Sequence, residues 1–134
     1  MQEKIISVNN LVKTFKSGDT NQTIINDLNL DIYKNDFTII MGSSGAGKST
    51  LMYALSGMDK ADSGSIIFND KNITKMNNDA LAIFRRKNCG FVFQQIYMLD
   101  KMSLMDNVLT SGLLLNKNKK EVIRKAKELF NKVN

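Results

Sequence analysis

The chain has 134 residues, of which 43% are hydrophobic and 24% charged, so it is long enough for one packed domain. No stretch approaches the ~20 apolar residues that a membrane-spanning helix needs, and no signal-peptide core follows the first residues. The single cysteine, Cys89, fits a reducing cytoplasm. The net charge of +6 comes mostly from residues 117–134, which form no basic patch interleaved with aromatic residues, so we expect no nucleic-acid partner.

The N-terminal part predicts strands. The first is Ile5–Val8, and a longer one runs from Thr23–Ile25 through Leu28–Tyr33, where apolar and polar residues alternate. This alternation is typical of a half-buried antiparallel sheet. Between the strands, residues 16–21 have the composition of a turn-rich loop, and Asn35 tolerates the left-handed conformation.

The next segment has the order strand, glycine-rich loop and helix. Phe37–Met41 is a short apolar run of the kind expected for a buried parallel strand, and Thr50–Ser56 suits a helix. Between them, residues 42–50 fit the phosphate-binding pattern G-x-x-x-x-G-K-[ST]; they are Gly42, Ser43, Ser44, Gly45, Ala46, Gly47, Lys48, Ser49 and Thr50. This motif in this setting predicts a nucleoside triphosphate site, with ATP as the expected ligand.

The residue types of the motif suit that chemistry. Its glycines let successive backbone N–H groups surround phosphate oxygens, and the N-terminus of the following helix favours anions. Lys48 supplies a positive charge for the β- and γ-phosphates, and the hydroxyl of Ser49 is an oxygen ligand for Mg²⁺. Thr50 is expected to be a secondary phosphate contact.

Further elements follow along the chain. We expect a hairpin-like piece at residues 64–70, a helix at 78–87, a short buried strand at 90–93, a helix at 103–115 and a last helix beginning near Asn118. The last helix carries one apolar stripe, made of Val122, Ile123, Ala126, Leu129 and Phe130.

The chain resembles the ATP-binding subunit of ABC transporters in two blocks, Met41–Leu51 and Leu81–Gln95. Within this family, it resembles the subgroup that serves lipoprotein release and macrolide or antimicrobial-peptide export. The resemblance implies an α/β phosphate-loop NTPase fold of ABC type, with an antiparallel β subdomain and a partial parallel-sheet core. It implies that residues 1–134 are the N-terminal portion of one ATP-binding domain, truncated before its second half.

The resemblance also assigns roles to residues outside the phosphate loop. Phe15 falls on the aromatic that stacks on adenine, with a core Phe at a strand end as the alternative. Gln94 falls on the glutamine that meets Mg²⁺ or the attacking water, so Lys48 and Gln94 are the expected catalytic residues. Residues 95–108 resemble the segment that contacts the membrane subunit, although methionines at helical spacing also suit a core. Asp100 stands where the family usually has Pro, and Ala46 where Ser is common.

The implied activity is MgATP hydrolysis that drives export through a separate transmembrane permease. The implied partners are that permease and a second ATP-binding subunit, with a homodimer expected for the complete protein, at the cytoplasmic face of the membrane. The signature motif, the catalytic acid and the switch histidine of the family are not matched here, and neither Asp70 nor Asp100 convincingly replaces the acid. We therefore expect this chain alone to bind ATP without appreciable hydrolysis and to associate. The alternatives are a non-hydrolysing nucleotide-binding or interaction fragment and a small phosphate-loop kinase.

Overall fold

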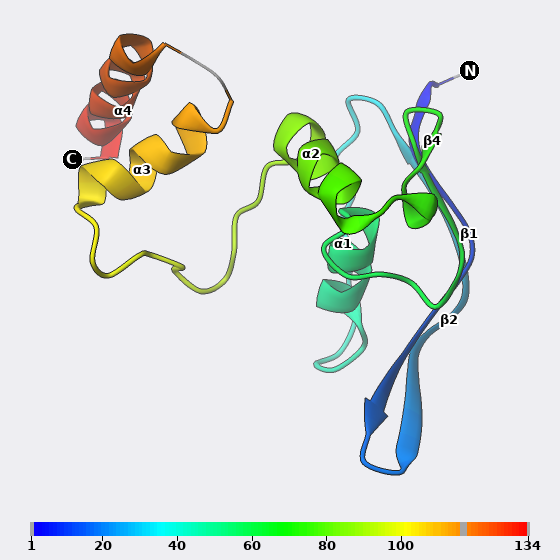
Figure 1. Cartoon of the computed structure of the whole chain (residues 1–134). Helices are drawn as coiled ribbons and strands as arrows, with labels where there is room; N and C mark the ends of the chain where they lie inside the picture. The colour runs from blue at the N-terminus through cyan, green and yellow to red at the C-terminus, as the bar shows by residue number, and fades with distance from the viewer. Residues whose placement is uncertain (1, 116–117, 134) are drawn as a thin grey trace. The chain divides into compact units, whose positions relative to one another are not determined.

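The computed structural model describes residues 2–115 and 118–133. The chain divides into two compact units, Met1–Arg85 and Arg86–Asn134. The first unit contains the sheet and the helix that follows the phosphate loop, and the second contains the two last helices (Figure 1).

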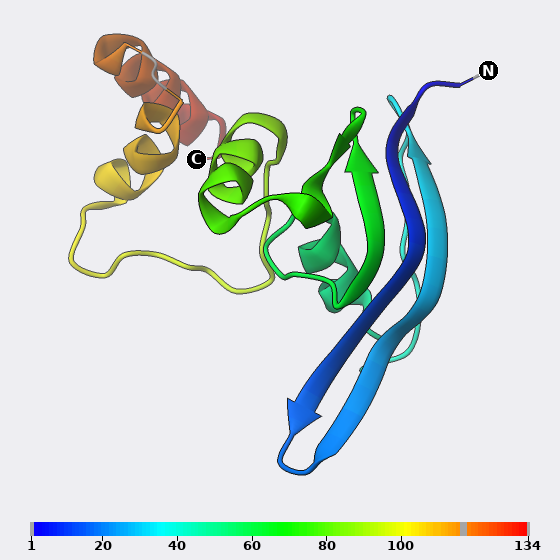
Figure 2. The ribbon, with the colours of Figure 1, turned by 45° about the vertical axis from the view of Figure 1, so that its right-hand side comes forward.

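The sheet of the first unit is antiparallel throughout, as the N-terminal alternation predicts. It consists of β1 (Lys4–Ser17), β2 (Thr20–Tyr33), β3 (Ser63–Phe68) and β4 (Lys71–Asn72), in the order β2-β1-β3-β4. Figure 2 shows β1 and β2 side by side as a long twisted ribbon with β3 along the other side of β1. The predicted hairpin-like piece at residues 64–70 is the β3–β4 pair.

The expected loop at residues 16–21 is wrong, because the two long strands continue almost to their tip. Lys16 pairs with Asn21 and Ser17 with Thr20, so only Gly18 and Asp19 turn the chain. Gly18 has φ +59°, which a tight two-residue hairpin turn requires. Phe15 consequently lies within β1, opposite Gln22 on β2.

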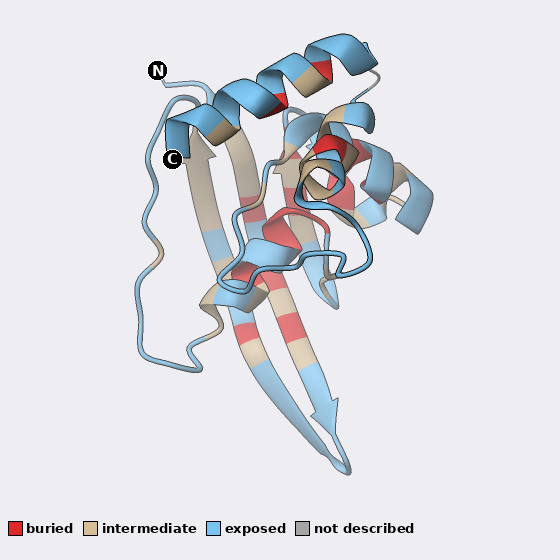
Figure 3. Cartoon of the chain, turned by 90° about the vertical axis from the view of Figure 1, so that its left-hand side faces the viewer, coloured by how far each residue is buried: buried red, intermediate tan, exposed pale blue. Residues whose placement is uncertain are grey.

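The core of the first unit lies between the sheet and its helices. These are α1 (Lys48–Leu55), the 3₁₀ turn η1 (Ile73–Lys75) and α2 (Asn78–Asn88), and Figure 2 shows α1 and α2 on one face of the sheet. The rings of Phe68 on β3 and Phe84 on α2 meet edge to face with centroids 4.9 Å apart. The buried apolar residues, which Figure 3 colours red, are Val8, Leu11, Ile25, Leu51, Ala54, Leu55, Ile66, Phe68, Ile73, Leu81 and Phe84.

The second unit is a pair of packed helices, α3 (Leu104–Leu113) and α4 (Lys119–Val133), close to the predicted spans. The Ser103 hydroxyl caps α3 by accepting a hydrogen bond from the Asp106 N–H, and the Asn118 side chain accepts from the Lys120 N–H at the start of α4. Leu109, Val122 and Ala126 form the buried core between them.

Two predicted buried strands are not formed: Phe37–Met41, expected to be parallel, and Gly90–Phe93. A strand exists only where its backbone groups bond to a neighbouring strand. Within the described residues the sheet contains only antiparallel pairs, and neither segment takes part in it. Most of their apolar residues are therefore exposed, such as Phe37 at 87% and Val92 at 98%.

No helix in the described part of the chain is long and apolar enough to cross a membrane.

The contact between Phe68 and Phe84 gives a stability prediction. Replacing Phe84 with Ala removes a buried ring and leaves a cavity, so the free energy of unfolding should fall by ~3–5 kcal/mol. The neighbouring Ile83 is 49% exposed, so Ile83→Ala should cost less than about 1 kcal/mol. Urea denaturation of both variants checks this, and equal losses would contradict the packing described.

Candidate functional site

The phosphate loop has the backbone conformation that its glycines allow. Gly45 and Gly47 are left-handed, with φ +79° and +82°, whereas Gly42 has φ 159°, close to extended. A Cβ on Gly42 would lie 3.2 Å from the Cβ of Ala46 across the loop, which is a tight contact. The small side chain of Ala46 thus suits a loop that folds tightly upon itself.

Lys48 is the first residue of α1, and its side chain turns back toward the loop. Its ammonium donates hydrogen bonds to the carbonyl oxygens of Gly42, at 2.9 Å, and Ser43, at 2.5 Å. The positive charge is therefore held beside the loop backbone, as a phosphate-binding role requires.

The N-terminus of α1 is open to an anion. Gly47 precedes the helix without a side-chain cap, and the first turn holds no acidic residue. The first-turn N–H groups therefore keep their capacity to donate to an anion. Ser43, Ser44 and Ser49 are all exposed around this end, and Thr50 is half-buried.

The donor set suits a magnesium ion that arrives with the nucleotide. Among residues 2–115 and 118–133, no three His, Cys, Asp or Glu side chains gather as a metal cage. Mg²⁺ is commonly bound by one or two protein oxygens together with phosphates and water. The exposed hydroxyl of Ser49 fits such a site, and Mg²⁺ there would neutralise phosphate charge.

The phosphate loop lies directly against β2. A Cβ on Gly47 would meet Cγ2 of Ile24 at 2.6 Å and the Ile24 carbonyl oxygen at 3.4 Å. Ile24 is two residues, or ~7 Å along a strand, from Gln22, which pairs with Phe15. The β1–β2 ribbon thus brings Phe15 into the neighbourhood of the loop.

Phe15 is not a core residue, since 43% of it is exposed. The ammonium of Lys13 lies over its ring, 5.0 Å from the centroid. An exposed aromatic on a paired strand near a phosphate loop is suited to stacking on a base.

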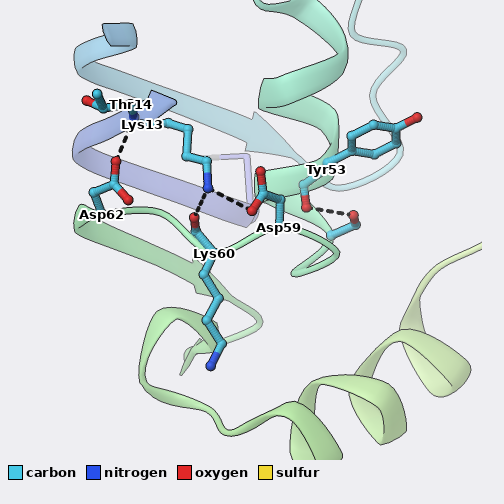
Figure 4. Close-up of polar contacts among 7 residues, drawn as sticks. Lys13, Thr14, Tyr53, Asp59, Lys60 and Asp62 are labelled. Carbon is cyan, nitrogen blue, oxygen red and sulfur yellow. Dashed lines mark hydrogen bonds and ion pairs between the residues drawn. The ribbon is translucent and has the colours of Figure 1, made fainter. Parts of the chain in front are cut away.

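Sequence reasoning missed the polar contacts next to Phe15, which Figure 4 shows. Lys13 is paired with Asp59 at 2.7 Å, and the backbone N–H of Thr14 donates to the Asp62 carboxylate at 2.6 Å. No local pattern could reveal these contacts, because their partners lie 46 and 48 residues apart in the chain.

Gln94 belongs to the second unit, where it is exposed and lies within the irregular segment that leads to α3. Asp100, which stands where the family usually has Pro, lies in a turn in which the Met102 N–H donates to the Leu99 carbonyl at 2.9 Å. Asn107, which the sequence reasoning also missed, holds this turn. Its side chain accepts from the Leu99 N–H at 2.8 Å and donates to the Ser103 carbonyl at 3.0 Å.

The same unit contains a groove of about 580 Å³ along α3 and α4. Tyr97 and Met98 line it together with residues of both helices, whereas Met105 packs against the core beneath. Met98 therefore belongs to a surface groove and Met105 to a core.

Comparison with known proteins agrees with the geometry of this site. A family model described as ABC transporter matches residues 25–134. This chain belongs to the ABC transporter family. The match confirms the resemblance and the α/β fold class expected from the sequence.

Relatives within the ABC transporter family are the proteins of the expected subgroup. The macrolide export ATP-binding/permease protein MacB of Pasteurella multocida is 35% identical over 130 residues, which are 97% of this chain and 20% of MacB. The lipoprotein-releasing system ATP-binding protein LolD of Wigglesworthia glossinidia brevipalpis is 38% identical over 112 residues, which are 84% of this chain and 49% of LolD. The chain thus spans at most about half the length of these two relatives.

A solved ABC transporter cassette has the same fold. The dimeric ATP-binding cassette MJ0796, bound to ADP and Pi, matches with a TM-score of 0.86 and 28% sequence identity, over 92% of this chain and 54% of that chain. The nucleotide and phosphate belong to that structure.

The contact between Gly47 and Ile24 gives a prediction for the site. Gly47→Ala adds a Cβ in a left-handed conformation against Ile24, so we expect the loop to be displaced and inorganic triphosphate binding to be lost. Gly45→Ala carries similar backbone strain but meets no atom within 4 Å, so it should retain more binding.

Isothermal titration with Mg²⁺-tripolyphosphate compares the two variants. Adding Ile24→Ala to Gly47→Ala removes the clashing methyl group and should restore part of the binding. Equal binding by the Gly45 and Gly47 variants would show that the approach to β2 does not shape the loop.

Proposed function

We propose that this chain is the nucleotide-binding part of an ABC transporter ATPase that powers export, and that it binds MgATP at residues 42–50. The observation that carries the proposal is the closed phosphate loop, with Gly45 and Gly47 left-handed and the Lys48 ammonium bonded to the loop carbonyls. The family match and the uncapped first turn of α1 support it.

In the proposed complex, each part of the site has a separate task. The loop N–H groups and Lys48 bind the β- and γ-phosphates, and Ser49 ligates Mg²⁺. Phe15 stacks on the adenine from β1. Gln94 meets Mg²⁺ or the attacking water, a role carried by the resemblance of Leu81–Gln95 to the family.

The proposed partners follow from the family and from the second unit. The relatives include an ATP-binding/permease protein, and the solved cassette is dimeric. We propose that the groove along α3 and α4, with residues 95–108 at its edge, receives a segment of a transmembrane permease. Its apolar wall of Met98, Leu104 and Val108 suits a partner helix. The chain would then work at the cytoplasmic face of the membrane with a second ATP-binding subunit.

The role of Lys48 is tested by ligand-dependent thermal stabilisation. At 100 times its dissociation constant, MgATP should stabilise the wild-type chain by about 2.7 kcal/mol. Lys48→Ala should abolish this shift while leaving the melting temperature without ligand nearly unchanged, because Lys48 bonds only to exposed loop carbonyls.

The matched control is Lys34→Ala, which removes an exposed lysine paired with Glu3. It should keep the full shift. An undiminished shift in Lys48→Ala would place the nucleotide elsewhere.

The role of Phe15 is tested with a fluorescent nucleotide. Phe15→Ala should weaken ATP binding by about 1–3 kcal/mol through lost stacking, while Phe15→Tyr keeps the ring and should change it little. Equal affinities for the wild type and Phe15→Ala would refute the stacking role.

A further inference from the structure

Lys13 occupies an unusual environment for a lysine. Among the described residues it is the one charged residue that is buried, with 8% of its surface exposed. Its ammonium donates to the Asp59 carboxylate at 2.7 Å and to the Lys60 carbonyl oxygen at 2.6 Å. Burying the charge of Lys13 carries a desolvation cost. Its location therefore indicates a role other than keeping the surface soluble.

The acceptors of Lys13 lie just after α1 and are fixed to the end of that helix. The carbonyl oxygen of Tyr53, which Figure 4 shows next to Asp59, accepts hydrogen bonds from the Asp59 N–H at 3.2 Å and from the Ser56 hydroxyl at 3.0 Å. Asp62 adds a second link to β1, because its N–H donates to the Val12 carbonyl at 2.9 Å. The strand that carries Phe15 is thus tied to the C-terminal end of the helix that begins at the phosphate loop.

The same ammonium contacts the ring of Phe15. It lies over the ring at 5.0 Å from the centroid, within the range of a cation–π interaction. The β1–β2 register shifts between Lys13 and Thr14, so the regular ladder is interrupted next to Phe15. Phe15 is 43% exposed, so the Lys13 ammonium lies over one face of a ring that is partly open to solvent.

We infer that Lys13 is a positioning residue for the nucleotide base: held by Asp59 and Lys60, its ammonium lies against one face of Phe15 and leaves the other face to stack on the base. This inference rests on the proposed stacking role of Phe15. The Lys13–Asp59 pair thereby fixes the base platform relative to α1, whose first turn binds the phosphates. Lys13 itself touches no part of the nucleotide.

The test separates base recognition from phosphate binding. MgATP and Mg²⁺-tripolyphosphate are titrated by calorimetry into the wild type and Lys13→Met, which keeps the apolar stem and removes the charge. We expect the affinity for MgATP to fall about two- to fivefold, because the Phe15 ring stays and only the cation–π contact that orients it is lost, and the affinity for tripolyphosphate to stay unchanged. In a Phe15→Ala background, Lys13→Met should cause no further loss.

Three further variants serve as controls for this test. Lys13→Arg keeps a cation over the ring and should restore binding of MgATP. Lys13→Met combined with Asp59→Asn avoids an unpaired carboxylate if the single variant folds poorly. Lys34→Met is the matched control, because Lys34 is paired with Glu3 at 2.8 Å and touches no aromatic ring in the described structure, so both affinities should be unchanged.

Several outcomes would overturn the inference. Equal losses for both ligands would make Lys13 a structural residue only, and no loss for either would remove its role altogether. A loss that persists in the Phe15→Ala background would mean that Lys13 acts on the nucleotide without Phe15. If Phe15→Ala itself leaves MgATP binding unchanged, it is the stacking proposal that fails.

Discussion

The close approach of Gly47 to Ile24 is the constraint on which the candidate site depends. With no Cβ at residue 47, the loop backbone reaches β2 and turns directly into α1. That contact sets where the first-turn N–H groups of α1 lie relative to the ribbon that carries Phe15. A phosphate site and a base platform on separate elements become one nucleotide site only if such a contact fixes their spacing.

The ends of α1 are fixed in different ways. The N-terminal end is positioned by backbone conformation and steric fit at Gly45 and Gly47. The C-terminal end is positioned by an ion pair and hydrogen bonds that involve Lys13, Asp59 and Asp62. Both ends are joined to the same β1–β2 ribbon. Leu51, Ala54 and Leu55 are buried on α1 and supply apolar packing. The polar contacts at the helix end add to this packing by fixing the orientation of α1.

Away from the site, an ion pair reinforces the ribbon near the other end of β1. The Lys4 ammonium lies 2.7 Å from a carboxylate oxygen of Asp31, and the Asp31 carboxylate also accepts a hydrogen bond from the Ser7 hydroxyl. The hydrogen bond from Lys4, followed by that from Ser7, holds the pKa of Asp31 below its ordinary value, and the bond to Asp31 raises the pKa of Lys4. Asp31 therefore stabilises the fold above its unfolded-state pKa, and this contribution is lost as the pH falls through its lowered folded-state pKa.

The sequence alone determined the local features whose causes lie within a few residues. The glycine pattern and Lys48 located the loop before α1, an apolar run located the start of β1, and alternation located most of β2. Capping residues such as Ser103 located helix starts. Tertiary structure alone decided which apolar runs are strands: Phe37–Met41 and Gly90–Phe93 have strand-like composition but no paired neighbour in the described residues. It also decided that Phe15 is exposed and that Lys13 is buried beside it, because the partner Asp59 lies 46 residues away, beyond the reach of any periodic pattern.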